Sequence, residues 1–266
     1  MNARPANDLT AALDAIIDRA LRDQRIVGAV VLTAQEGRAT YSRAAGLADR
    51  EAGRHMALDS ILRLSSLTKP IVTAAALALV EDGTLSLDDT AERWLPDFRP
   101  KLGSEAPPIT VRQLLTHTAG LSYGFMQPAD GPYLKLGVSD GMDQPGLGFE
   151  AELARIVQAG LFFPPGAAWL YSVGLDVLGA ILEAAAGETL PDIVARRVTR
   201  RLGLADTGFA VTDADRLAVP YVDGQPPRAM ADPDVVPFAE LSGIRYSPRR
   251  AFELTRATLD SALDVV

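Results

Sequence analysis

The sequence contains no cysteine among its 266 residues, which excludes disulfides, cysteine nucleophiles and thiolate metal sites together. Basic residues are in the minority. Against 34 Asp and Glu there are 26 Lys and Arg, and the net charge of −8 argues against a general nucleic-acid-binding surface. Long apolar runs are missing too, because the longest one, residues 71–80, contains Thr73 and is too short to span a bilayer. We therefore expect neither a nucleic-acid partner nor a membrane partner.

The N-terminal segment lacks the unbroken apolar core of a secretion signal, because Asp8 and Asp14 interrupt it. The sequence thus predicts a cytoplasmic location. No cluster of His with Glu suggests a metal site, and we expect no cofactor. The hydrophobic fraction of 48% and the charged fraction of 23% are those of a globular protein with a real core, in one or two domains.

Hydrophobic periodicity predicts how the chain is organised. Residues 8–22 have the spacing of an amphipathic helix, and two β-rich runs at 26–32 and 39–46 predict an antiparallel hairpin. The Gly/Pro-rich stretch 128–148 is typical of a lid or pocket wall. Further helices are expected at 68–82, 110–117, 149–159, 173–187, 190–202 and 254–266.

A Ser-x-x-Lys pattern, Ser66 to Lys69, stands just before the helix expected at 68–82. Residues i and i+3 share a face of a helix, so the amine of Lys69 can approach the hydroxyl of Ser66. A serine needs a neighbouring base to become a nucleophile, and a lysine can act as one when its uncharged form is favoured. The chain uses only three Lys against 23 Arg, which suggests that arginine cannot replace the lysine at this position.

A second candidate element places Tyr171 between the loop Pro164-Pro165-Gly166 and the helix expected at 173–187. A tyrosine at such a junction can reach a pocket. Its phenol can then pass a proton between Ser66 and a leaving group. The alternative, that Tyr171 is a half-buried packing residue, is common for tyrosines and stays open from the residue alone.

Four blocks in order resemble the serine β-lactamase and penicillin-binding superfamily, and more narrowly its class C β-lactamases and the related family VIII carboxylesterases. The blocks are Leu64-Ser65-Ser66-Leu67-Thr68-Lys69-Pro70, Ile109 to Leu121, Pro164-Pro165-Gly166 with Tyr171-Ser172, and Leu202 to Phe209. The resemblance implies Ser66 as the acylated nucleophile and Lys69 with Tyr171 as the proton-transfer pair. It implies an α+β fold of the β-lactamase/transpeptidase type, with an antiparallel sheet flanked by helices and a mostly helical subdomain.

The residue at the third position of the tyrosine motif, Tyr171-Ser172-Val173, favours an ester over a lactam as the substrate. β-Lactamases of this branch usually carry Asn there, which binds the acylamino group of the substrate, whereas this chain carries Val173. An apolar side chain offers that group no hydrogen bond. The segment from Gly131 to Gly141 also resembles the esterases, and we expect Tyr123, Tyr133 and Val173 to line the substrate pocket.

Two other patterns imitate catalytic motifs. Residues 120–124 read Gly-x-Ser-x-Gly around Ser122, but a nucleophile elbow needs a later histidine, and both His55 and His117 precede Ser122. We therefore interpret Ser122 as a turn residue. The second pattern is Ser139-Asp140-Gly141, which we also interpret as a turn. We interpret His117 as a residue that structures a helix end.

The third motif of the superfamily, Lys/His-Thr-Gly or Trp-Gly-Gly, does not follow Tyr171. In the resembled family its strand supplies one oxyanion-hole N–H, and loss of such a donor costs on the order of 10²–10³ in rate. We therefore expect a truncated or rearranged member with an incomplete sheet, whose edge is open to self-association. The expected regions are a helix and hairpin at 1–65, a helical subdomain at 66–210 and a segment at 211–266 that returns toward the sheet.

The leading hypothesis from the sequence is a serine carboxylesterase that cleaves small esters through an acyl-Ser66 intermediate. Two alternatives stay open: a β-lactamase or D-alanyl peptidase, and an inactive homologue that only binds its ligand. Acyl and alcohol preferences cannot be predicted from the sequence.

Overall fold

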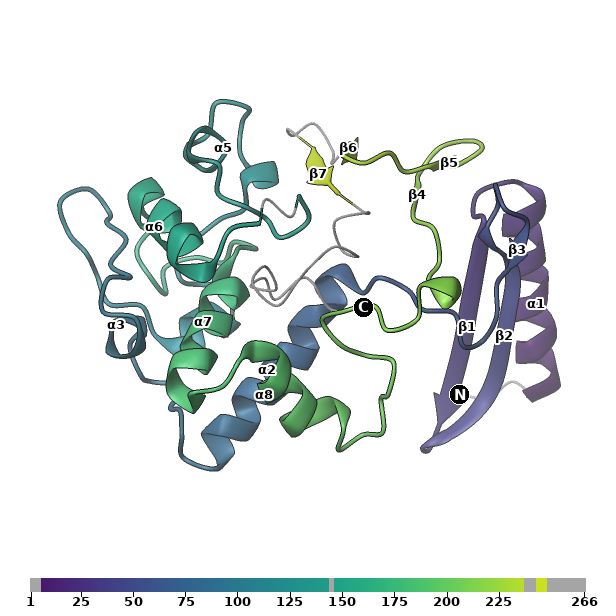
Figure 1. The fold of residues 1–266 in the computed structure, drawn as a ribbon, viewed down its shortest axis with the longest axis horizontal. Coiled ribbons are helices and arrows are strands. Elements are labelled where there is room, and N and C mark those ends of the chain that lie inside the picture. The colour runs from purple at the N-terminus through teal and green to yellow at the C-terminus, as the bar shows by residue number, and fades with distance from the viewer. Residues whose placement is uncertain (1–5, 144–145, 237–242, 248–266) are drawn as a thin grey trace. The chain divides into compact units, whose positions relative to one another are not determined.

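The structure is a computed structural model that describes residues 6–143, 146–236 and 243–247 (Figure 1). The chain divides into two compact units, one made of Met1–Arg63 with Thr212–Ala231 and the other of Leu64–Val211 with Asp232–Val266. We describe each unit by itself. The helix expected at 254–266 lies outside the described residues.

The first unit is built on the predicted hairpin, which the structure confirms. Strand β1 (Gly28–Gln35) pairs antiparallel with β2 (Arg38–Asp49), and the short β3 (Arg54–His55) lies on the far side of β2. The two-residue turn between β1 and β2 has positive φ at both Glu36 and Gly37, which matches the twist of an antiparallel pair. Among the described residues, β1 has a partner strand on one side only.

The predicted N-terminal helix is also confirmed as α1 (Ala6–Arg22), which lies along the hairpin in Figure 1. Polar side chains hold α1 to β2. The Tyr41 hydroxyl donates to the Asp14 carboxylate at 2.6 Å, and Arg43 pairs with Asp14 at 2.8 Å and with Asp18 at 2.5 Å. The same acid is thus shared by a phenol and a guanidinium, which fixes the helix over one face of the sheet.

Residues 212–231 return to the first unit and contain η4 (Ala214–Arg216), β4 (Tyr221–Val222) and β5 (Arg228–Ala229). Leu217 forms an isolated β-bridge with Ile61, and the Val219 N–H donates to the Ala48 carbonyl at 2.8 Å. Backbone hydrogen bonds therefore join this late segment to the N-terminal sheet.

The second unit is mostly helical and contains the largest hydrophobic core of the described chain. Helix α7 lies at its centre, since every residue from Gly174 to Leu182 is buried and the helix contacts α2, α3, α4 and α8. The elements of this unit are η1 (Ser65–Leu67), α2 (Thr68–Glu81), α3 (Ala91–Trp94), α4 (Val111–Leu115), η2 (Gly124–Met126), α5 (Pro132–Leu136), α6 (Phe149–Ala159), α7 (Gly174–Ala186), α8 (Leu190–Val194), η3 (Ala195–Thr199), β6 (Asp234–Val236) and β7 (Ile244–Tyr246).

Two local features differ from the sequence-based expectation. The helix expected at 190–202 is α-helical only to Val194 and continues as the π-helix η3 to Thr199. Within the stretch 128–148, where no element was expected, Pro132 begins the short helix α5 and Gly137 ends it in the left-handed conformation. Proline at the start and glycine just past the end are the usual signals of helix termini.

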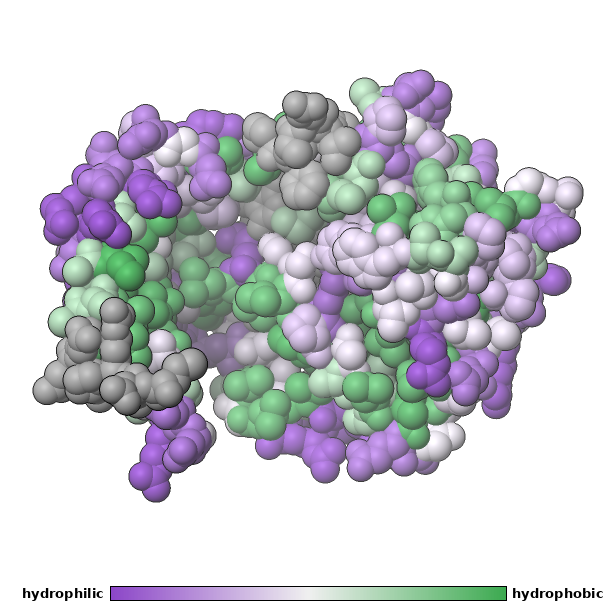
Figure 2. Space-filling view, turned by 180° about the vertical axis from the view of Figure 1, so that it is seen from behind, coloured by the Kyte–Doolittle hydropathy of each residue, from purple (hydrophilic) through white to green (hydrophobic). Residues whose placement is uncertain are grey.

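The surface carries scattered apolar side chains. The face in Figure 2 has hydrophilic and hydrophobic residues interspersed, and exposed leucines such as Leu77 and Leu202 are ordinary for a folded protein. Within the described ranges, no helix combines the length and the hydropathy needed to cross a membrane.

Candidate functional site

Ser66 lies at the start of the helical unit, in the 3₁₀ turn η1 that leads directly into α2. Its side chain is exposed, so its hydroxyl is accessible to a substrate. The preceding residue, Ser65, has φ of 46°, a left-handed conformation that is uncommon for residues other than glycine. Such strained positions cluster at functional sites.

Lys69 stands one turn beyond Ser66, as the i, i+3 spacing predicts. It is 7% exposed, and its Nζ donates a hydrogen bond to the Ser66 Oγ at 3.4 Å. The Lys69 Nζ also lies over two aromatic rings, 4.8 Å from the centroid of Tyr171 and 5.4 Å from that of Tyr123. The two rings pack against the amine and hold it beside Ser66.

Tyr171 comes from a distant part of the chain to complete this group. It precedes α7 in a loop, and its hydroxyl lies 2.6 Å from the Ser66 Oγ. Either oxygen can be the donor, so the contact can carry a proton in both directions. The structure therefore brings together the three side chains that the sequence singled out: Ser66, Lys69 and Tyr171.

Tyr123, expected in the substrate pocket, lies against this group but is 1% exposed. Its ring stacks on Phe125 at 4.8 Å and tilts toward Tyr171 at 5.1 Å. Burial, and then the nearby carboxylate of Asp176, raise the pKa of the Tyr123 phenol well above 10. The hydroxyl of Tyr123 therefore stays protonated. Both tyrosines lie beside Lys69, but the hydroxyl that contacts Ser66 is that of Tyr171.

The other two residues expected in the pocket are buried in the core. Tyr133 has no exposed surface, its hydroxyl accepts the Ser122 N–H at 3.4 Å, and its ring packs on Phe162. Val173 is 1% exposed and forms the N-cap of α7. In this structure both support the site from within the core.

The serine of the Gly-x-Ser-x-Gly pattern is not a nucleophile in this geometry. Ser122 is 1% exposed, and its hydroxyl donates to the carbonyl of Tyr123 at 3.2 Å. Ser122 lies in an irregular segment just before η2, and its role as a turn residue stays a prediction.

His117 has a larger part in the site than sequence reasoning assigned to it. It follows α4, whose start is fixed by a capping box between Thr110 and Gln113. Its carbonyl accepts the Leu170 N–H at 2.9 Å and its Nδ1 accepts the Ser172 N–H at 3.3 Å, so it contacts both neighbours of Tyr171. Burial, and then the charge of Lys69, lower the pKa of His117 to about 4. The signal that could have indicated this role is that the chain has only two histidines, one of them within a family-like block.

Three acids, the partly buried Asp140 and Glu152 and the buried Asp176, lie near one another, and Asp140 and Asp176 also lie near Tyr123. Burial raises the pKa of Asp140 to about 7 and that of Glu152 to about 8, with neighbouring carboxylates adding to both shifts. The third acid, Asp176, is 9% exposed. An aspartate within the apolar sequence of α7 was a visible signal for this group. Among the described residues no group of His, Cys, Asp and Glu could hold a metal ion.

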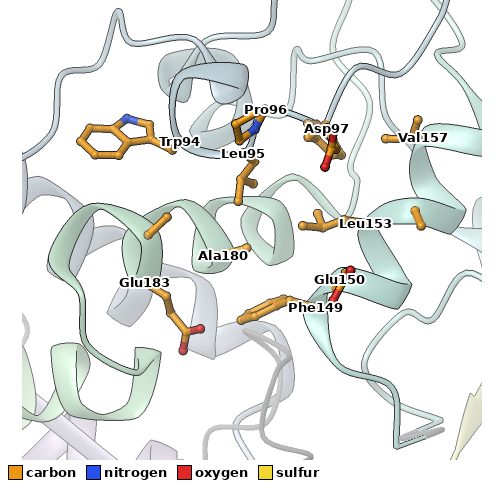
Figure 3. Close-up of a pocket in the computed structure, with 13 residues that line it drawn as sticks. Trp94, Leu95, Pro96, Asp97, Phe149, Glu150, Leu153, Val157, Ala180 and Glu183 are labelled. Atoms are coloured by element: carbon orange, nitrogen blue, oxygen red, sulfur yellow. The ribbon is translucent and has the colours of Figure 1, made fainter.

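A separate cavity of about 650 Å³ lies between α3, α6 and α7 of the same unit (Figure 3). Figure 3 shows Trp94, Leu95, Pro96 and Asp97 on one side and Phe149, Glu150 and Glu183 on the other. Among the described residues, its lining includes no serine, threonine, lysine, histidine or tyrosine, and its charged side chains are the carboxylates of Asp97, Glu150 and Glu183. The described lining therefore offers no hydroxyl or amine for acyl transfer, and it shares no residue with the group around Ser66.

Comparison with known proteins agrees with this geometry. Residues 13–259 match the family model described as Beta-lactamase. Esterase EstB of Burkholderia gladioli is 49% identical over 253 residues, which cover 93% of this chain and 64% of EstB. Lovastatin esterase of Penicillium rubens is 32% identical and matches 87% of this chain and 60% of its own length.

The solved structure of EstCE1, described as a hydrolase with promiscuous acyltransferase activity, superposes with a TM-score of 0.93 at 41% identity. The alignment covers 98% of this chain and 69% of EstCE1. The chain thus spans less than two thirds of the length of the two curated relatives named above. The likeness confirms the α+β fold of the β-lactamase/transpeptidase type that the motifs implied, and the chain belongs to the beta-lactamase family.

Proposed function

We propose that this chain is a serine carboxylesterase that cleaves small carboxylic esters through an acyl-Ser66 intermediate. The observation that carries the proposal is the contact of the Ser66 Oγ with two proton carriers, the Tyr171 hydroxyl at 2.6 Å and the Lys69 amine at 3.4 Å. A serine hydroxyl becomes a nucleophile when such a neighbour accepts its proton. The names of Esterase EstB and of the hydrolase EstCE1 support this assignment over the other functions in the family.

In the acylation step, the Ser66 Oγ attacks the ester carbonyl while its proton passes to the Tyr171–Lys69 pair. The pair then returns that proton to the alkoxide of the leaving alcohol. In deacylation the same pair takes a proton from water, the hydroxide attacks the acyl-Ser66 carbonyl, and the proton returns to Ser66. Ser66 also lies in the first turn of its helical segment, where N–H groups have no intrahelical acceptor, and its own N–H is the donor we assign to the oxyanion.

Val173 favours an ester as the substrate. It occupies the third position of the tyrosine motif and is buried and apolar, so it offers no hydrogen bond to an acylamino group. We therefore expect turnover of a short p-nitrophenyl ester to exceed turnover of nitrocefin. The reverse order would favour the β-lactamase alternative.

The test is a serine-directed phosphonate combined with peptide mapping. We expect stoichiometric labelling of Ser66 with loss of ester turnover, and neither labelling nor turnover in the Ser66→Ala variant. A Ser122→Ala variant should keep both. Labelling at any other serine, or turnover that survives Ser66→Ala, would refute the proposal. Undiminished ligand binding without any turnover would support the binding-protein alternative instead.

Two further parts of the proposal concern assembly and location. We infer self-association through the open side of β1, because an unpaired strand edge is a template for another strand. Light scattering of the purified chain tests this: a monomer at every concentration would contradict it. The cytoplasmic location stays a prediction that cell fractionation can check.

A further inference from the structure

His117 contacts the chain on both sides of Tyr171. Its carbonyl accepts the Leu170 N–H at 2.9 Å, and its ring Nδ1 accepts the Ser172 N–H at 3.3 Å. The ring itself lies 4.8 Å from the Tyr171 ring and 6.2 Å from that of Trp169. His117 thus contacts each of the four consecutive residues from Trp169 to Ser172, through its ring or through its own carbonyl.

Close packing of α4 against α7 allows His117 to reach the residues around Tyr171. Gly174 begins α7, and a Cβ at this position would lie 2.9 Å from the Leu114 carbonyl near the end of α4. Only glycine allows this approach without displacement of the backbone. The approach brings the start of α7, and with it Ser172, against the histidine that follows α4. His117 itself has φ of 55°, in the left-handed region that residues other than glycine rarely adopt.

The hydrogen bonds define the state of the imidazole. The His117 Nδ1 lies 3.3 Å from the backbone N of Ser172 and 3.3 Å from its hydroxyl oxygen. Because the N–H can only donate, Nδ1 carries a lone pair and the proton of the neutral ring is assigned to Nε2. Lys69 lies near the ring, and its positive charge opposes protonation of the imidazole. The ring therefore acts as an acceptor and not as a general acid toward the substrate.

We propose that His117 is a positioning residue, which holds the Tyr171 phenol in contact with Ser66 by accepting the hydrogen bond of the neighbouring Ser172 amide. This inference rests on the proposed function for its effect on rate, but not for its effect on structure. Proton transfer depends steeply on geometry, and a displacement of about 1 Å can reduce a rate about 10²-fold.

Two variants separate the acceptor from the backbone conformation. Both His117→Asn and His117→Gly suit a positive φ, but only Asn carries an oxygen close to the place of Nδ1. We expect kcat for a p-nitrophenyl ester to fall at least about 30-fold in His117→Gly, with KM changed less than about 3-fold. His117→Asn should stay within about 3-fold of the parent kcat, because it restores the acceptor.

A third variant covers the case in which His117→Gly does not fold. His117→Phe keeps an aromatic ring against Tyr171 and Trp169 but has no acceptor. A kcat that falls at least about 30-fold in a folded His117→Phe variant supports the hydrogen bond as the cause. A parent-like kcat in a folded His117→Phe or His117→Gly variant would overturn the inference.

Hydrogen exchange provides a readout that does not need activity. The Ser172 amide should exchange at least about tenfold faster in His117→Gly and His117→Phe than in the parent chain, and at the parent rate in His117→Asn. Equal exchange at Ser172 in all four proteins would overturn the positioning role. If the parent chain neither turns over esters nor reacts at Ser66, the proposed function fails, and the exchange rates still decide the role of His117.

Discussion

Glu152 on α6 makes the stability of the helical unit depend on pH in a direction opposite to that of most acids. Its Oε1 accepts the Ser139 N–H at 2.8 Å, but its Oε2 is buried and has no hydrogen-bond partner among the described residues. Burial, and then the negative charge of Asp176, raise its pKa from 4.5 to about 8. The side chain is therefore neutral in the folded protein at pH 7, whereas it is ionised in the unfolded chain.

The sign of the effect follows from linkage. Below pH 4.5 the folded and unfolded chains both carry protonated Glu152, so the group does not change the free energy of unfolding. As pH rises from 4.5 to about 8 the unfolded chain alone loses the proton, and the free energy of unfolding decreases by about 1.4 kcal/mol per pH unit. The full window corresponds to about 5 kcal/mol. Because the side chain is partly exposed and solvent screens it, we expect about 2–4 kcal/mol.

The Glu152→Gln substitution removes this titration and keeps an oxygen for the Ser139 N–H. Urea unfolding, followed by circular dichroism, should find the variant about 2–4 kcal/mol more stable than the parent at pH 9 and equal to it at pH 4. Glu150→Gln on the same helix is the matched control. Glu150 is exposed, so its substitution should change stability by less than about 1 kcal/mol at both pH values. A stability difference between Glu152→Gln and the parent that is the same at pH 4 and pH 9 would refute the reasoning.

Three further predictions concern the site and the core. Tyr171→Phe should lower kcat for esters about 10²–10⁴-fold with little change in KM, since the 2.6 Å contact to Ser66 is lost; an unchanged kcat would exclude Tyr171 from proton transfer. Arginine stays charged and cannot accept a proton, so Lys69→Arg should slow phosphonate labelling of Ser66 about as much as Lys69→Met does. Labelling at the parent rate would contradict a base at this position. Leu178→Ala, in the fully buried face of α7, should cost about 2–5 kcal/mol in urea unfolding, and a loss below about 1 kcal/mol would place Leu178 outside the core.

The parts of the fold that the sequence predicted are those with local causes. The amphipathic spacing of α1, the hairpin and the proximity of Ser66 to Lys69 all follow from the periodicity of a helix or strand. Helix α5 was missed because five residues are too short for periodicity, although Pro132 and Gly137 marked its ends. The change from α-helix to π-helix after Val194 leaves no trace in the hydrophobic pattern.

The relations that could not be predicted join residues far apart in the chain. His117 and Ser172 are separated by 55 positions, and only the packing of α4 on α7 shows that they meet. The pocket role expected for Tyr133 had a sequence pattern behind it, but no pattern shows that the side chain would be fully buried. The position of Tyr171 beside Ser66 followed from family motifs and not from any spacing within the chain.

The left-handed backbone of Ser65 has a consequence for engineering. An L-residue in that conformation loses about 1–2 kcal/mol relative to an ordinary helical one, and glycine or asparagine would relieve the loss. Consensus or stability screens will therefore favour replacements at residue 65, directly beside the exposed hydroxyl of the candidate nucleophile. A gain in melting temperature there would come from relief of strain in the turn η1 that positions Ser66, and the same substitution would change the backbone beside the nucleophile. Thermostable libraries of this chain should therefore hold residue 65 fixed.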